Sequence, residues 1–186
     1  MAVPDHEEAS RILAGRRLPE GIVRHSEGVS RVAVAAARMV EAAGIPVDVA
    51  VVEAAALLHD IDKLTTRRTG GPHGEVGARM LEKMGFGELA AAVSSHPVSC
   101  LLDEDRFPRG WEPVIVSLAD KHVEQTFLTI DERLARMAER YPEYRESIEA
   151  ARRPAHALEA ELSSATGIPI AEIERRLRRA WESGTT

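Results

Sequence analysis

Apolar residues recur at helical spacing along most of the chain, whereas the alternation that marks half-buried strands is scarce. Asp5, followed three residues later by Glu8, forms a helix-opening pair and predicts a short helix ending near Gly15. A second helix is predicted over residues 22–40, because its apolar residues lie three, four or seven positions apart. Gly44 follows this pattern and marks its end.

The middle of the chain alternates between apolar segments and residues that break helices. Asp48 is a suitable cap for a third helix, and the segment Val49–Leu58 is apolar on nearly all sides, as in a buried helix. Residues 65–72 end in two glycines and a proline, which predicts a loop. The polar segment 102–111 has the composition of a lid. Further helices are predicted around residues 72–84, 88–96 and 113–123.

The C-terminal part has a different pattern, with amphipathic segments that are strongly charged on their outer faces. It predicts helices at roughly 131–140, 143–163 and 169–183. A core of Ala, Leu and Val with only 4% aromatic residues favours close-packed helices over a β-sandwich. We therefore predict an all-α fold in a single domain, residues 1–186, with its core at about 18–130 and a C-terminal helical extension at about 131–186.

Composition narrows the classes of partner. A formal net charge of −6 provides no field that would collect a nucleic-acid polymer or an anionic membrane. The single cysteine, Cys100, excludes an internal disulfide and a cysteine-based zinc cluster. Apolar runs are too short to span a bilayer, and the N-terminus lacks the features of a signal peptide, so we expect a cytoplasmic location.

Several predicted helices each carry a histidine or a carboxylate on an otherwise apolar face. These residues are His25, His59 with its neighbour Asp60, His96 and Asp120. A buried ionised aspartate is costly unless it is paired or bound to a metal, so one divalent centre would satisfy the whole set. Taken singly, each histidine also fits a hydrogen-bonded role in the core, and Asp60 also fits an ion pair with Lys63.

The order His25, His59-Asp60 and Asp120 resembles the H…HD…D signature of the HD-domain metal-dependent phosphohydrolases. The surroundings are also similar to the family's motifs: Leu-Pro-Glu-Gly-Ile-Val-Arg-His, Ala-Leu-Leu-His-Asp-Ile-Asp-Lys and Ser-Leu-Ala-Asp-Lys. The resemblance covers about residues 18–130. It implies an HD-domain helical bundle that hydrolyses phosphate esters or anhydrides with bound metal.

Two further histidines bear on the subtype, because His73 and His96 occupy places where binuclear members carry extra ligands. Among those members the sequence resembles the YqeK-type hydrolases, which are associated with symmetrical cleavage of diadenosine tetraphosphate. The implied cofactors are two divalent transition-metal ions, iron first among them, with manganese, cobalt or zinc as alternatives. The implied ligands are His25, His59 and Asp120 for one ion, His73 and His96 for the other, and Asp60 as the bridge.

The resemblance also implies residues that act on the substrate. Asp60 is expected to be catalytic through its bridging position, and Lys63 is expected to contact a phosphate, as in the family's HD-x-x-K form. The alternative for Lys63 is a plain ion pair with Asp60. Arg24 and Lys121 are further candidates for substrate contact.

The sequence also departs from the family pattern. Asp62 stands where many relatives have glycine, and it either orients a histidine ring or weakens anion affinity. The HD-GYP phosphodiesterases fit less well, because no Gly-Tyr-Pro follows and His96 has no second histidine beside it. His122 lies two residues after Asp120 on a predicted helix, so we expect it to point away, toward the surface.

The function predicted from these residues is metal-dependent hydrolysis of a phosphate ester or anhydride of a small nucleotide. Two alternatives stay open: a nucleoside monophosphate phosphatase with one metal ion, and a regulatory nucleotide-binding module whose metal site is structural. A small nucleotide is the expected partner, with no nucleic-acid polymer and no membrane. A homodimer is left open.

Overall fold

The computed structural model describes residues 3–184, which form eleven α-helices and no strand. The predicted all-α fold is therefore confirmed. The first three helices are α1 at His6–Gly15, α2 at Glu20–Ala42 and α3 at Val49–Leu58. Asp5 and Asp48 accept hydrogen bonds from amides in the first turns of α1 and α3, as their positions in the sequence predict.

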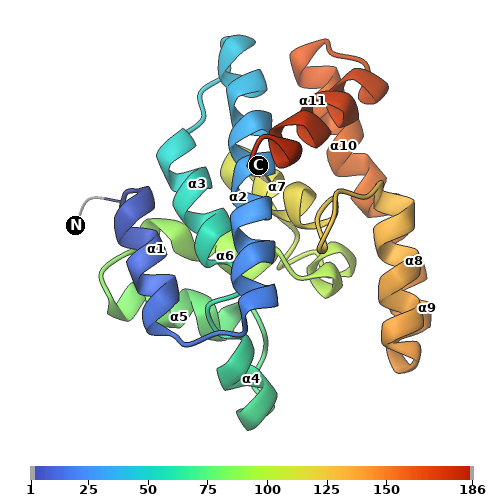
Figure 1. Cartoon of the computed structure of the whole chain (residues 1–186). Coiled ribbons are helices and arrows are strands. Elements are labelled where there is room, and N and C mark those ends of the chain that lie inside the picture. The colour runs from blue at the N-terminus through green and yellow to red at the C-terminus, as the bar shows by residue number, and fades with distance from the viewer. Residues whose placement is uncertain (1–2, 185–186) are drawn as a thin grey trace.

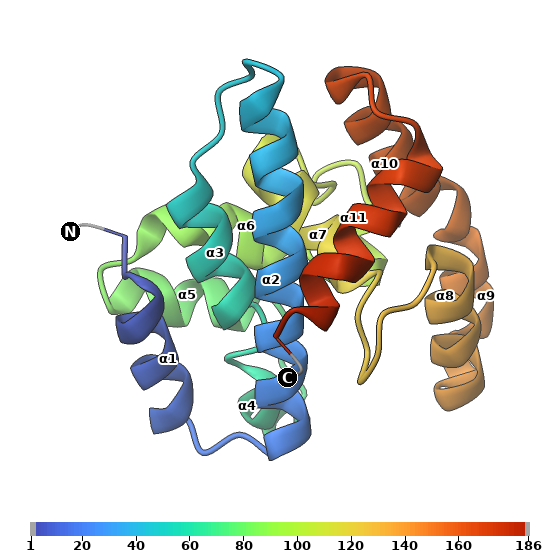
Figure 2. The same ribbon diagram turned by 45° about the horizontal axis from the view of Figure 1, so that its top comes forward.

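The core is built around α2, which lies in the centre of the molecule with α3 and α7 (Trp111–Asp120) packed against it (Figures 1 and 2). The apolar side chains that α2 carries at helical spacing are almost completely buried; they include Val29, Val32, Ala36 and Val40. In α3 every residue from Ala54 to Leu58 is buried, because other helices cover it on several sides. The last turns of α3 and α7 therefore lie inside the molecule.

The segment between α3 and α7 forms three short helices, α4 at Lys63–Thr69, α5 at Glu75–Lys83 and α6 at Ala90–Ser95. Two single turns of 3₁₀-helix, Gly87–Leu89 and Val98–Leu102, flank α6. The loop predicted over residues 65–72 is wrong in its first half, where α4 continues to the left-handed residue Gly70 (φ 71°). The start of α5 is also later than predicted, because Gly74, at φ 84°, precedes it as the cap.

The C-terminal helices are α8 at Ile130–Arg140, α9 at Arg145–Ala150, α10 at Arg152–Thr166 and α11 at Ile170–Glu182, with a 3₁₀ turn at Pro142–Tyr144. The single helix predicted over 143–163 is wrong, because the chain breaks between α9 and α10 at Ala151. Pro154 gives the physical reason: a proline has no N–H for the preceding turn and fits only the first turn of a new helix.

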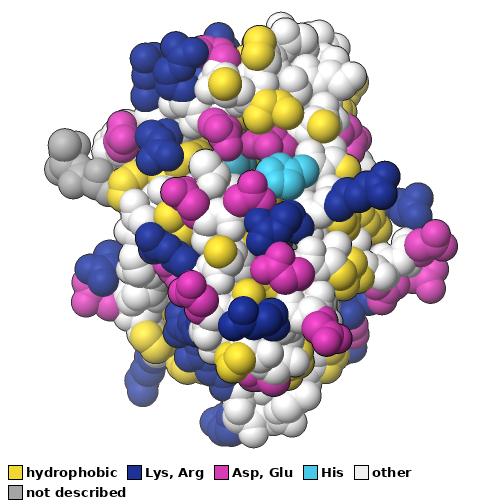
Figure 3. Space-filling model, turned by 90° about the vertical axis from the view of Figure 1, so that its right-hand side faces the viewer, with side chains coloured by type: hydrophobic (Ala, Val, Ile, Leu, Met, Phe, Trp, Pro, Cys, Tyr) yellow, Lys and Arg dark blue, Asp and Glu magenta, His cyan; other side chains and the backbone are white. Residues whose placement is uncertain are grey.

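These C-terminal helices lie on one side of the core, where α11 packs against α2 and α10 contacts α2, α7 and α8 (Figures 1 and 2). Charged side chains of both signs are interspersed over this side of the molecule, with apolar atoms in scattered patches (Figure 3). None of the described helices combines the length and the hydropathy that crossing a bilayer demands.

Candidate metal centre

The predicted ligands come from the ends of helices that meet inside the bundle. His25 lies in α2, His59 and Asp60 directly follow α3, His96 follows α6 and Asp120 is the last residue of α7. The C-terminal end of a helix carries partial negative charge, because its last carbonyl groups lack intrahelical partners. The ten-residue helices α3 and α7 both end at this cluster, so the backbone itself favours a cation there.

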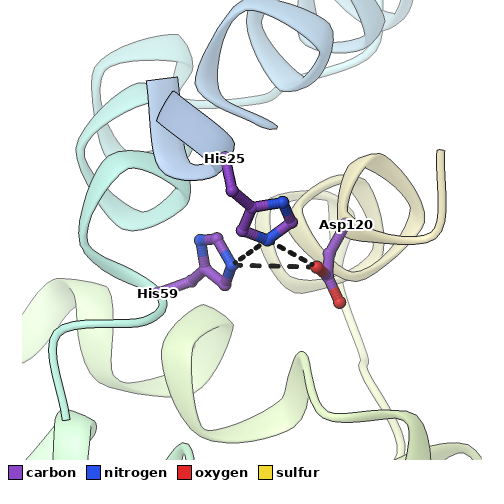
Figure 4. A group of neighbouring side chains, drawn as sticks. All are labelled: His25, His59 and Asp120. Carbon is purple, nitrogen blue, oxygen red and sulfur yellow. Dashed lines mark hydrogen bonds and ion pairs between the residues drawn. The ribbon is translucent and has the colours of Figure 1, made fainter. Parts of the chain in front are cut away.

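One half of the cluster joins three segments at close range (Figure 4). The His25 Nε2 atom lies 3.2 Å from His59 Nε2 and 3.1 Å from Asp120 Oδ1. The third side of the triangle, from His59 Nε2 to Asp120 Oδ1, is 3.7 Å. His59 is fully buried and the side chain of Asp120 is 14% exposed, so the group lies just below the surface.

The other half of the cluster is arranged around Asp60, which is 1% exposed. Its Oδ2 atom faces His25 and His59, at 3.7 and 3.5 Å from their Nε2 atoms. Its Oδ1 atom faces His73 and His96, at 3.2 and 3.8 Å from their Nε2 atoms. The two oxygens of one carboxylate are thus directed at two different pairs of histidines.

Three of these imidazole rings are held in place by a hydrogen bond at Nδ1. His59 Nδ1 lies 2.7 Å from the carbonyl oxygen of Ala56, and His96 Nδ1 lies 2.6 Å from that of Val93. A carbonyl can only accept, so Nδ1 carries the proton in each ring and Nε2 presents its lone pair to the cluster. His73 is held in the same way, because its Nδ1 lies 2.7 Å from Asp62 Oδ1.

The two aspartates stay ionised in spite of their burial. Burial alone raises the pKa of the Asp60 carboxyl, but His59 and Lys63 beside it hold that pKa well below its usual value. Burial likewise raises the pKa of Asp120, but the Lys121 ammonium, the hydrogen bond from His25 and the nearby His59 together hold that pKa well below its usual value. Both carboxylates are therefore in the charged form that binds a metal ion.

The histidines divide into two kinds. Burial lowers the pKa of His59 to about 4 and moves the pKa of His96 well below its usual value, so both rings are neutral near pH 7. Burial also lowers the pKa of His73, but the carboxylates of Asp60 and Asp62 beside the ring outweigh burial and raise that pKa to about 9. A cation bound beside His73 must therefore displace a proton from this ring.

The donor set fits divalent metal ions. Imidazole nitrogens and carboxylate oxygens converge from six side chains, and the buried Asp60 Oδ1 has no hydrogen-bond partner among the described residues. Two groups of three meet the spacing of a metal site: His25, His59 and Asp120 in one, and His59, Asp60 and His96 in the other. An orphaned carboxylate oxygen facing ring nitrogens is costly unless a cation lies between them.

Asp62 acts behind the cluster. It is fully buried; its Oδ1 accepts the His73 hydrogen bond, and its Oδ2 accepts hydrogen bonds of 2.9 Å from the amides of Gly74 and Gly77. A Cβ at position 77 would lie 3.1 Å from Val93 Cγ1, so the glycine lets α5 pack closely against α6 beside this carboxylate. Of the two roles that the sequence leaves open for Asp62, the structure favours orientation of a histidine ring.

The three basic residues predicted for substrate contact lie in different places. Lys63 borders the cluster, with its Nζ 2.5 Å from Asp60 Oδ2 and its side chain 30% exposed. Arg24 points outward and pairs with Glu20 on the surface of α2. Lys121 differs from the prediction: it is fully buried, and its Nζ donates to Asp120 Oδ2 and to the carbonyl oxygens of His96 and Ser117.

Lys121 therefore holds the Asp120 carboxylate in place and does not face the solvent. Its ammonium holds Asp120 Oδ2 at 2.9 Å, which leaves Oδ1 directed at His25. This role could not be predicted from the sequence, because a lysine next to a buried aspartate can equally point outward. The apolar segment of α7 just before Lys121 was a weak sign that this residue is buried.

The expectation of a surface position for His122 is wrong. His122 is fully buried, because the chain leaves the helix after Asp120 and turns His122 toward the C-terminal helices. Its Nδ1 lies 2.9 Å from the carbonyl oxygen of Leu128, and its ring stacks on Phe127. The helix predicted over residues 113–123 includes this position, whereas α7 ends at Asp120.

The comparisons with known proteins agree with this geometry. The HD domain profile matches residues 22–124, more than half of the chain. An uncharacterized protein of Methanocaldococcus jannaschii is 34% identical over 95 residues, which are 50% of this chain and 55% of that protein. The chain thus spans about half the length of this curated relative. No solved structure matches the chain.

The helical bundle encloses a cluster of histidines and aspartates whose spacing suits a divalent metal ion. The chain belongs to the HD-domain family.

Proposed function

We propose that the protein is a binuclear HD phosphohydrolase that cleaves a phosphoanhydride of a small nucleotide, with diadenosine tetraphosphate as the first candidate. The observation that carries the proposal is the position of Asp60, whose two carboxylate oxygens face two different pairs of histidines. A carboxylate in this position is suited to bridge two ions. One ion would be held by His25, His59 and Asp120, and the other by His73 and His96.

Two divalent ions supply a water of lowered pKa as the nucleophile and positive charge for the phosphate oxygens. The protein supplies the rest. The Nδ1 hydrogen bonds of His59 and His96 keep their Nε2 lone pairs aimed at the cluster, and Lys121 keeps Asp120 aligned. These contacts are rigid and buried, so the ligands need little reorganisation during turnover.

Lys63 is the residue that we assign to the substrate. Its ammonium lies next to Asp60 and its side chain is partly exposed, so it lies between the ligand cluster and the solvent. When Asp60 binds ions, the lysine loses its carboxylate partner and can turn its charge toward a phosphate oxygen. A short phosphate chain suits this arrangement, because the protein as a whole carries a net charge of −6 and would repel an extended anion.

The test is a panel of nucleotides supplied with iron, manganese or cobalt, with products identified by liquid chromatography. Diadenosine tetraphosphate should be cut at its centre to give two molecules of ADP. Lys63→Ala should lower turnover without changing metal content, because Lys63 touches the substrate and not the ions. Lys83→Ala, at an exposed position in α5, is the matched control and should behave as the wild type.

Other outcomes have defined meanings. AMP plus ATP as products would place the attack at a different phosphorus. Release of phosphate from nucleoside monophosphates by protein with one ion per chain would favour the mononuclear phosphatase. Nucleotide binding without turnover of any compound in the panel would favour the regulatory binding module.

A further inference from the structure

We call the cluster of His25, His59, Asp60, His73, His96 and Asp120 the HD centre. A second group of potential ligands lies outside it, where the C-terminal helices meet the core. His122 follows α7, Glu159 lies in α10 and Glu174 lies in α11. One ligand atom from each of the three residues lies within 4.8 Å of those of the other two. Three segments that are far apart in the sequence thus converge on one point.

The His122 ring is fixed in a way that aims one nitrogen at this point. Its Nδ1 lies 2.9 Å from the Leu128 carbonyl oxygen, so Nδ1 carries the proton and Nε2 has a free lone pair. Stacking on Phe127, with ring centroids 5.2 Å apart and 6° between the planes, fixes the plane of the ring. The Nε2 atom points at Glu159 Oε1, which is 3.5 Å away.

Neither of these facing atoms has a hydrogen-bond partner among residues 3–184. His122 is fully buried and Glu159 is 2% exposed, so water does not satisfy them from the surface. Glu159 Oε2 has only His156 near it, 3.6 Å away, and no lysine or arginine within the described part of the chain forms an ion pair with Glu159 or Glu174. A ring nitrogen and a carboxylate oxygen that both need a positive partner are costly to bury unless a cation joins them.

We propose that His122, Glu159 and Glu174 form a second metal site, separate from the HD centre, that binds one divalent transition-metal ion such as zinc. One imidazole nitrogen and two carboxylate oxygens are a donor set that zinc accepts, with water in the remaining position. The site ties α10 and α11 to the turn after α7, so the ion holds the C-terminal helices against the core. This proposal does not rest on the proposed substrate.

The first experiment removes the HD centre from the measurement. In a His25→Ala/His73→Ala background, the protein should retain one zinc per chain after dialysis against buffer, as measured by mass spectrometry of the metal. Adding Glu174→Gln should remove that zinc, because this change takes away a charged ligand. Adding Glu172→Gln should not, since Glu172 lies on the same helix but pairs with Arg175 and Arg176.

Loss of zinc from the background protein itself, or its retention after Glu174→Gln, would overturn the proposal. A second measurement covers the case in which the background does not fold. Crystals of the wild-type protein soaked in zinc should show an anomalous difference peak about 2.0–2.1 Å from His122 Nε2. Peaks at the HD centre with none beside His122 would reduce the three residues to an unoccupied polar cluster.

Discussion

At the scale of single residues, each of two candidate ligands is held in place by one particular neighbouring side chain. Asp62 and Lys121 touch no substrate, yet one holds His73 and the other holds Asp120. The resemblance to a known family supplied six candidate ligands, and the structure brings all six side chains together. The supporting contacts could not be predicted, because they depend on how α5 and α7 approach the cluster in space.

Asp62→Asn should weaken one of the two metal positions. Three donors converge on the Asp62 carboxylate, from His73 and from the amides of Gly74 and Gly77, whereas an asparagine side chain offers only one acceptor oxygen. The affinity for the ion next to His73 should fall about 10–100-fold. Metal titration with calorimetry measures this, and Asp105→Asn in the exposed loop before α7 is the control. Unchanged affinity would show that His73 does not need this partner.

Asp60→Asn should lose most of both ions. One carboxylate oxygen faces each pair of histidines, so neutralising this side chain removes negative charge from both metal positions at once. Elemental analysis of anaerobically purified protein should give close to two ions per chain for the wild type and far fewer for the variant. Full occupancy in the variant would exclude Asp60 as a ligand.

At the scale of helices, sequence periodicity located most elements and failed where local breaks decide the outcome. The apolar faces of α2 and α3 specify these helices without ambiguity, because burial enforces the pattern. The boundary between α9 and α10 depends instead on Pro154, whose effect the amphipathic pattern conceals. The helix α4 was missed because its polar sequence carries no apolar face.

A group of exposed ion pairs between α8 and α10 should make the free energy of unfolding depend on pH. Asp131 in α8 pairs with Arg152 and His156 in α10, and its hydrogen bonds from His156 and Arg152 lower its pKa below the ordinary value of 3.8. A lowered folded pKa means that the stabilisation is present above pH 3.8 and is lost as the pH falls through the folded pKa.

Asp131→Asn should therefore reduce the free energy of unfolding at pH 7 by less than about 1 kcal/mol, because the pair is largely exposed. The difference from the wild type should shrink as the pH falls below 4. Urea unfolding of both proteins between pH 3 and pH 7 checks this. A difference that stays constant with pH would mean that Asp131 acts through something other than its charge.

At the scale of the whole molecule, the C-terminal helix α11 approaches the core helix α2 closely at Gly28. A Cβ at Gly28 of α2 would lie 3.1 Å from Val123 Cγ1 and 3.2 Å from Trp181 Nε1, so α11 reaches α2 only because this residue has no side chain. Sequence analysis predicted the C-terminal helices and their charged outer faces. The packing of α11 on α2 could not be predicted, because a glycine within a helix indicates only a position of low helix propensity.

Gly28→Val should destabilise the protein by about 1–3 kcal/mol, because the added atoms overlap Val123 and Trp181 at this junction. Gly21→Val in the same helix is the matched control, since the nearest atom to a Cβ there is 3.8 Å away. The control should change stability by less than about 0.5 kcal/mol. Denaturant midpoints give both values, and equal losses at the two positions would remove the special role of Gly28.

The ligands of the HD centre are spread along the chain from His25 to Asp120, and they meet only after α2, α3, α6 and α7 have packed. An ion bound there acts as a cross-link that the unfolded chain cannot form. Its binding free energy is added to folding, by about 2.7 kcal/mol when free metal exceeds the dissociation constant a hundredfold. With an ion bound there, the melting temperature of this protein should rise with the free metal concentration around it.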